Sequence, residues 1–120
     1  MNKGRLLQAY GVLAGASLEK VEVKDRIMII KLLRSVRTEA EELQDFINEV
    51  REKNQEILEQ NADRQAIAEI VKTINEESEK QIAAKDINII TTATFEKLIE
   101  SNPRWTPTAM MAVEDVFVAQ

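Results

Sequence analysis

The feature that most constrains this chain is the absence of glycine and proline between Ala16 and Asn102. Glycine occurs only at positions 4, 11 and 15, and proline only at 103 and 107. These residues are the strongest helix breakers, so a long stretch without them favours a mainly helical middle. A length of 120 residues fits one domain, 1–120. We therefore predict a single domain with a mainly α fold.

Within this stretch, residues 23–60 carry a heptad pattern that predicts one long amphipathic helix over about 24–59. Nine positions follow one another alternately four and three residues apart, and eight of the nine are apolar. Such spacing is typical of the contact between helices in a coiled coil. We name this set the seam; its members are Ile29, Leu33, Val36, Ala40, Leu43, Ile47, Val50, Asn54 and Ile57.

A helix of this length needs a partner along its seam. Residues 24–59 would extend about 50 Å at ~1.5 Å per residue, whereas a compact chain of this size has a radius of gyration of about 14 Å. The partner can be the other half of a helical hairpin, a second copy or another protein. Asn54, the polar member of the seam, has two interpretations: it fixes the register of paired helices, or it marks the frayed end of the seam.

A helical hairpin is predicted because the seam loses its register at Asn61–Asp63. Turn-forming residues cluster there, so we predict a turn followed by a third helix over about 63–81, with one continuous helix as the alternative. Three shorter helices are predicted as well, over residues 2–14, 94–101 and 107–118. Asn2 can cap the first, Pro103 stops the second, and a Thr-Pro pair opens the third.

Two short β-branched stretches are compatible with strands. Val21–Val23 and Asp86–Thr92 are both candidates for a minor two-stranded ribbon packed on the helices. Near the C-terminus, Trp105, Met110 and Met111 suit either the core or an interface, and the core is the favoured interpretation.

The composition disfavours catalytic and metal chemistry. The chain has no histidine and no cysteine, which removes imidazole bases, thiolate nucleophiles and the common zinc ligands. Carboxylates spaced along residues 39–59 resemble those of metal-bridging helical bundles, but such sites also need Glu-x-x-His pairs. A solvated or partner-binding acidic face explains them better. We predict a protein that is not an enzyme, with no catalytic residue, no cofactor and no metal.

The long helix is basic in its first half and acidic in its second. Residues 24–37 carry five cationic side chains and one acidic side chain, whereas residues 39–60 carry two cationic side chains and eight acidic ones. A solvated face is the favoured interpretation of the cations, because no aromatic residue is interleaved and the net charge is −5. Nucleic acid is the disfavoured alternative, for which the candidate phosphate contacts are Lys24, Arg26, Lys31, Arg34 and Arg37.

No segment predicts a membrane span. The apolar runs fall short of the ~20 residues that a span requires, and Gln8 and Tyr10 interrupt an N-terminal stretch that otherwise resembles a signal peptide. We expect no membrane association and a location in the cytoplasm, or in a particle assembled there.

The order of elements resembles that of small uncharacterised helical proteins encoded by tailed bacteriophages and prophages. The layout begins with GRLLQAYGVLAG and a Val-Glu-Val-Lys connector. Specific similarity is limited to the helix after the connector, IIKLLRSVRTEAEELQDFINEVREK, and to the ending WTPTAMMAVEDVFV. The resemblance implies a structural, assembly or accessory protein of phage or mobile-element origin. It transfers no catalytic or binding residue.

These features together predict an interaction protein that self-associates or binds a phage or host protein. Antiparallel pairing would place the basic half of each long helix beside the acidic half of its partner, although screening limits this term at exposed positions. We therefore expect an antiparallel homodimer, or a larger homo-oligomer, formed through the seam.

Overall fold

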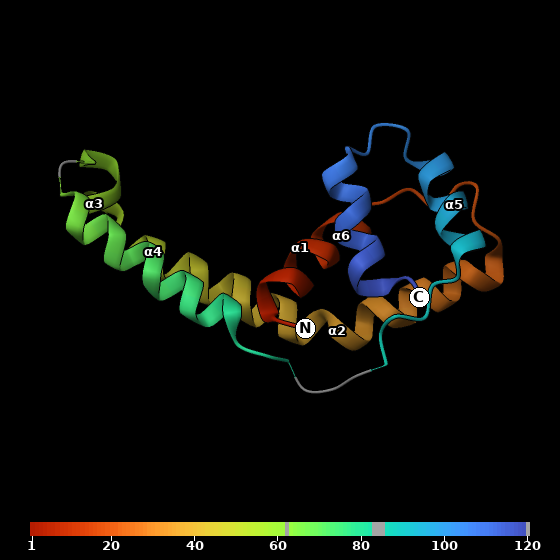
Figure 1. The fold of residues 1–120 in the computed structure, drawn as a ribbon, viewed down its shortest axis with the longest axis horizontal. Coiled ribbons are helices and arrows are strands. Elements are labelled where there is room, and N and C mark those ends of the chain that lie inside the picture. The colour runs from red at the N-terminus through yellow and green to blue at the C-terminus, as the bar shows by residue number, and fades with distance from the viewer. Residues whose placement is uncertain (62, 83–85, 120) are drawn as a thin grey trace.

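The fold is mainly α-helical, as predicted (Figure 1). The computed structural model describes residues 1–61, 63–82 and 86–119. The helices within these residues are α1 Lys3–Ala14, α2 Val23–Lys53, α3 Gln55–Gln60, α4 Arg64–Glu79, α5 Thr92–Ser101 and α6 Pro107–Phe117.

The predicted single helix over 24–59 is wrong at Asn54, where α2 ends and α3 begins. Asn54 has φ −117° and ψ 21°, and its Nδ2 donates to the Val50 carbonyl oxygen at 2.7 Å. A side chain that bonds the backbone one turn back competes with regular helix and bends it. The polar member of the seam therefore lies at a break in the helix.

The hairpin turn is built by its two flanking residues, while Ala62 between them lies outside the described residues. Asn61 ends α3 in the left-handed conformation, with φ 49°, which asparagine tolerates better than most residues. Asp63 caps α4 by accepting a hydrogen bond from the Ala66 amide at 3.0 Å. The chain thus reverses direction where the heptad register is lost.

Side-chain caps set the starts of three other helices. The Asn2 carboxamide accepts from the Arg5 amide at 2.8 Å, so α1 starts as predicted. The Thr106 hydroxyl accepts from the Ala109 amide at 3.1 Å, and the predicted Thr-Pro start of α6 is also present. The helix predicted from 94 begins earlier, at Thr92, because the Thr91 hydroxyl caps it.

The predicted ribbon between Val21–Val23 and 86–92 does not form in the described residues. Val21 lies buried in the connector, and Val23 is already the first residue of α2 because the Glu22 carbonyl accepts from the Asp25 and Arg26 amides. The extended segment pairs elsewhere. Ile90 forms a single parallel bridge with Val118, with hydrogen bonds of 2.8 Å to the Phe117 carbonyl and from the Ala119 amide.

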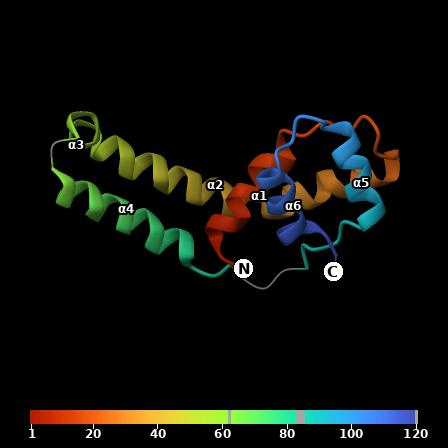
Figure 2. The ribbon, with the colours of Figure 1, turned by 45° about the horizontal axis from the view of Figure 1, so that its top comes forward.

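The core lies where α1, α5 and α6 gather over the first half of α2 (Figures 1 and 2). Its fully buried side chains include Leu6, Ile29, Leu98 and Phe117. Trp105 and Met110 pack against this cluster, as predicted for core residues. Met111 does not, since it is 62% exposed.

The second half of α2, with α3 and α4, forms a hairpin that projects from this core (Figure 2). We name residues 41–76 the arm. The arm makes the molecule elongated, with extents of 51 × 31 × 21 Å and a radius of gyration of 16.7 Å.

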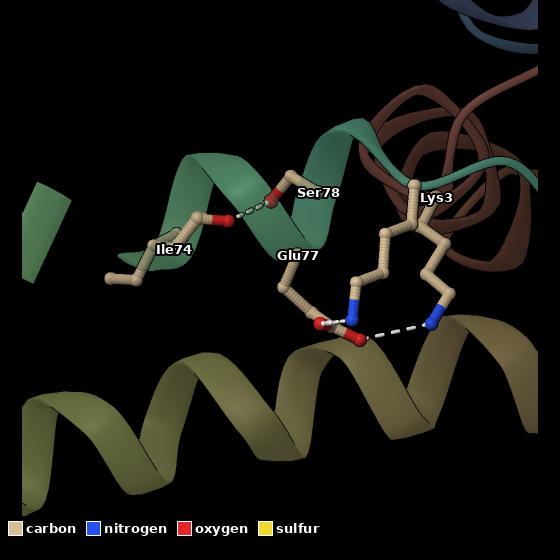
Figure 3. Close-up of polar contacts among 5 residues, drawn as sticks. Lys3, Ile74, Glu77 and Ser78 are labelled. Atoms are coloured by element: carbon tan, nitrogen blue, oxygen red, sulfur yellow. Dashed lines mark hydrogen bonds and ion pairs between the residues drawn. The ribbon is translucent and has the colours of Figure 1, made fainter. Parts of the chain in front are cut away.

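A three-residue ion cluster fastens the C-terminal end of α4 to α1 (Figure 3). The Glu77 carboxylate accepts from Lys3 Nζ at 3.0 Å and from Lys80 Nζ at 2.6 Å. Gly4 lies against this part of α4, because a Cβ at Gly4 would stand 3.2 Å from the Ser78 Cβ. The N-terminus of α1 therefore packs closely on the end of α4.

This cluster predicts a pH-dependent contribution to stability. Hydrogen bonds from Lys80 and Lys3 hold the pKa of Glu77 below its usual value, so the contribution is present above that value and lost as the pH falls through the lowered pKa. We expect Glu77→Gln to melt below the wild type at pH 7, with the difference shrinking once the pH falls below the usual pKa of a glutamate and vanishing below the lowered pKa. Thermal melts followed by circular dichroism measure this. The exposed neighbour Glu76→Gln is the control, and an unchanged difference at low pH would contradict the assignment.

Candidate interaction surface

The seam is covered largely within one chain. Ile29, Val36, Ala40 and Leu43 are at most 2% exposed and lie on the face of α2 that packs against α1 and α4. The other members of the seam are half-buried: Leu33, Ile47, Val50, Asn54 and Ile57. The middle of the seam is therefore covered by helices of the same chain, which matches the hairpin among the three partners that the sequence allows.

The opposite side of α2 is exposed along its full length, and we name it the outer face. Residues three, four or seven apart lie on nearly the same side of a helix, so the residues on this side form one set of positions. Every member of the set is exposed: Val23, Lys24, Ile27, Ile30, Lys31, Arg34, Thr38, Glu41, Glu42, Asp45, Asn48, Glu49 and Glu52. In both views of the ribbon, α2 extends along most of the long axis of the molecule (Figures 1 and 2).

An apolar ridge lies at the N-terminal end of the outer face. Val23, Ile27 and Ile30 are 67%, 49% and 43% exposed and follow one another at helical spacing. An apolar groove lies beside the ridge, between α2 and the extended segment before α5. Its lining includes Met28, Leu32 and Ile89, with Lys24 and Lys31 at the rim.

The five predicted phosphate contacts are not gathered into one site. Arg26 is used inside the fold, since its Nε donates to the Val21 carbonyl at 2.7 Å and its Nη2 to the Glu19 carbonyl at 2.9 Å. Arg37 pairs with Glu41 at 2.8 Å, and this hydrogen bond raises the pKa of the guanidinium.

The other three cations remain on the outer face. Lys24 reaches Glu22 only at 3.9 Å, and Lys31 and Arg34 have no ion pair among the described residues. They alternate with the apolar ridge rather than forming a continuous basic track.

The ridge could be predicted from a run of apolar residues that does not follow the heptad spacing. Residues 27–30 are four consecutive apolar residues, Ile-Met-Ile-Ile. At 100° per residue these four positions spread over most of the helix circumference, so one buried face cannot hold them all. Ile29 occupies the buried face, and Ile27 and Ile30 are left on the outer one.

The described residues contain no group of acidic side chains arranged to hold a metal ion. None of their helices is long and apolar enough to cross a membrane. No protein-family model, curated protein or solved structure matches the chain.

Proposed function

We propose that this chain is a non-enzymatic interaction protein, of the structural, assembly or accessory kind, which acts by self-association or by binding a partner protein. The observation that supports this best is the ridge of Val23, Ile27 and Ile30 beside an apolar groove. Scattered apolar side chains are ordinary on protein surfaces, whereas neighbouring ones on one face indicate a contact site. The elongated shape, with a projecting arm, suits a protein that makes extended contacts.

We also propose a phage or mobile-element origin, with a location in the cytoplasm or in a particle assembled there. Support comes from the order of elements and from the segments quoted above. The genes beside this one provide the test. Capsid, portal or tail genes would support the proposal, and replication or repressor genes would favour the nucleic-acid alternative.

Site-specific photo-crosslinking in the cells of origin tests the interaction role. We expect a photoreactive side chain at Ile30 to give protein adducts, because this residue lies on the ridge. The control position is Glu96, which is exposed on α5 rather than on α2. If Ile30 gives no more adducts than Glu96, the proposal fails.

Binding to nucleic acid should be weak. Three cations on a face shared with apolar side chains offer few phosphate contacts, and each contact adds to the salt dependence of binding. We expect fluorescence anisotropy to show no complex with duplex DNA tighter than the high-micromolar range at physiological salt. A low-micromolar, salt-sensitive complex that Arg34→Glu weakens across all sequences would contradict this ranking.

A further inference from the structure

Six of the charges on the outer face form three pairs of opposite sign, placed symmetrically about Thr38. Arg34 lies four residues before Thr38, and Glu42 lies four after. The same relation holds at a distance of seven residues for Lys31 and Asp45, and at fourteen for Lys24 and Glu52. All six side chains are exposed on the same side of α2.

Offsets of four, seven and fourteen residues keep side chains on one face of a helix. Suppose that a two-fold axis runs beside Thr38, at right angles to α2, between two copies of the chain. Each residue that lies a given number of positions before Thr38 then faces the residue that lies the same number of positions after Thr38 on the other copy. Every cation of the set then lies opposite an acid. A parallel arrangement would instead place like charges together.

We propose that the outer face binds a second copy of this chain, with the two α2 helices antiparallel and crossing at Thr38. The inference rests on the proposed interaction function and names its partner. The charge complement of the face is present on the chain itself, which favours a second copy over an unrelated acidic protein. The proposed contact between copies therefore lies on the outer face, and not on the seam expected from the sequence, which α1 and α4 cover.

The apolar ridge gains burial in this arrangement. Val23 and Ile27 would lie beside the aliphatic stems of Lys53 and Glu49 of the other copy, and long charged side chains cover apolar surface in this way. Exposed ion pairs add little energy by themselves, so the charges set orientation and the ridge adds contact area.

The contact should be weak and sensitive to salt. The helix α2 has 31 residues, which at ~1.5 Å per residue gives a strip about 46 Å long and ~10 Å wide. Roughly 450 Å² per copy lies at the low end of specific interfaces. We expect a dissociation constant on the order of 10 µM at low salt, rising at least about tenfold at high salt as the ion pairs are screened.

Charge reversal on each half of the face tests the proposal. One variant is Lys31→Glu with Arg34→Glu, and the other is Glu42→Lys with Asp45→Lys. Each alone should be monomeric at 100 µM (about ten times the expected dissociation constant), because the 34/42 and 31/45 pairs about Thr38 then join like charges. An equimolar mixture should restore the dimer, since each half again meets its opposite. Analytical ultracentrifugation gives the masses.

Matched variants away from the face control for the change in net charge. Lys20→Glu with Arg104→Glu, and Glu96→Lys with Glu114→Lys, alter exposed positions outside α2 and should leave the dimer intact. Circular dichroism verifies that every variant is folded.

Three results would overturn the proposal: a monomeric wild type, dimers that survive both reversals, or a mixture that stays monomeric. The photo-crosslinking experiment keeps the two inferences separate. Adducts of Ile30 to another protein, with a monomeric wild type, would refute the second copy as partner and leave the interaction function standing. A monomeric wild type without adducts would refute both.

Discussion

Replacing Phe117 with alanine should lower the free energy of unfolding by about 3–5 kcal/mol, because the change empties the most voluminous fully buried site of the described core. Phe117 is 0% exposed at the end of α6, and its carbonyl accepts the Ile90 amide in the bridge between Ile90 and Val118. A loss of this size is a large part of the stability of a domain of this length.

Urea unfolding followed by circular dichroism measures this change. Met111→Ala is the matched control, because Met111 lies on the same helix and is 62% exposed. We expect the control to stay within about 0.5 kcal/mol of the wild type. If the two substitutions cost the same, the core is not packed around α6 as described.

Leu43→Asp should detach the arm or unfold the chain, with a cost of at least about 3 kcal/mol. Leu43 is 2% exposed on the face of α2 that packs against α1 and α4. A carboxylate there has to be dehydrated without a partner, so the arm opens to hydrate it. Amide hydrogen exchange should accelerate more in α4 than in α6.

The control is Gln44→Asp, which places the same acid at the next, exposed residue of α2. It should leave exchange in α4 nearly unchanged. Equal acceleration in both variants would mean that charge, not burial, causes the effect. Unchanged exchange in the Leu43 variant would contradict the packing of the seam within the chain.

Much of the helical layout is predictable because it depends on local chemistry. Asn2, Asp63 and Thr106 each cap the helix that follows them, and such side chains accept backbone hydrogen bonds within one turn. The turn near Asn61 follows from a change in apolar register together with turn-forming residues. None of these features needs information about distant parts of the chain.

The surface that covers the seam could not be predicted, because it depends on contacts far apart in sequence. Heptad spacing identifies a face that needs covering but not the helix that covers it. Gly4 allows α1 to lie close to Ser78 of α4, and the Glu77 ion cluster then fastens the pair. The contacts of Gly4 with Ser78 and of Lys3 with Glu77 join residues 74 positions apart, and no periodicity in the sequence reports them.

The same limit applies to the break at Asn54 and to the outer face. An asparagine on an apolar seam is compatible with a register-fixing pair, a frayed end or a bend, and only the hydrogen bond to Val50 selects the bend. The outer face becomes recognisable once the buried face of α2 is assigned, since the charges about Thr38 face away from the core.

The seam is covered within one chain, and the outer face is open to a partner. Thiol labelling tests it, because the chain has no cysteine of its own. Below about 1 µM, where a weak dimer is dissociated, Ile30→Cys should react within about tenfold of the unfolded chain. Leu43→Cys should react at least ~100-fold more slowly, because labelling requires local opening. If dilution instead removes the protection of Leu43→Cys, the seam depends on a second copy and the account is wrong.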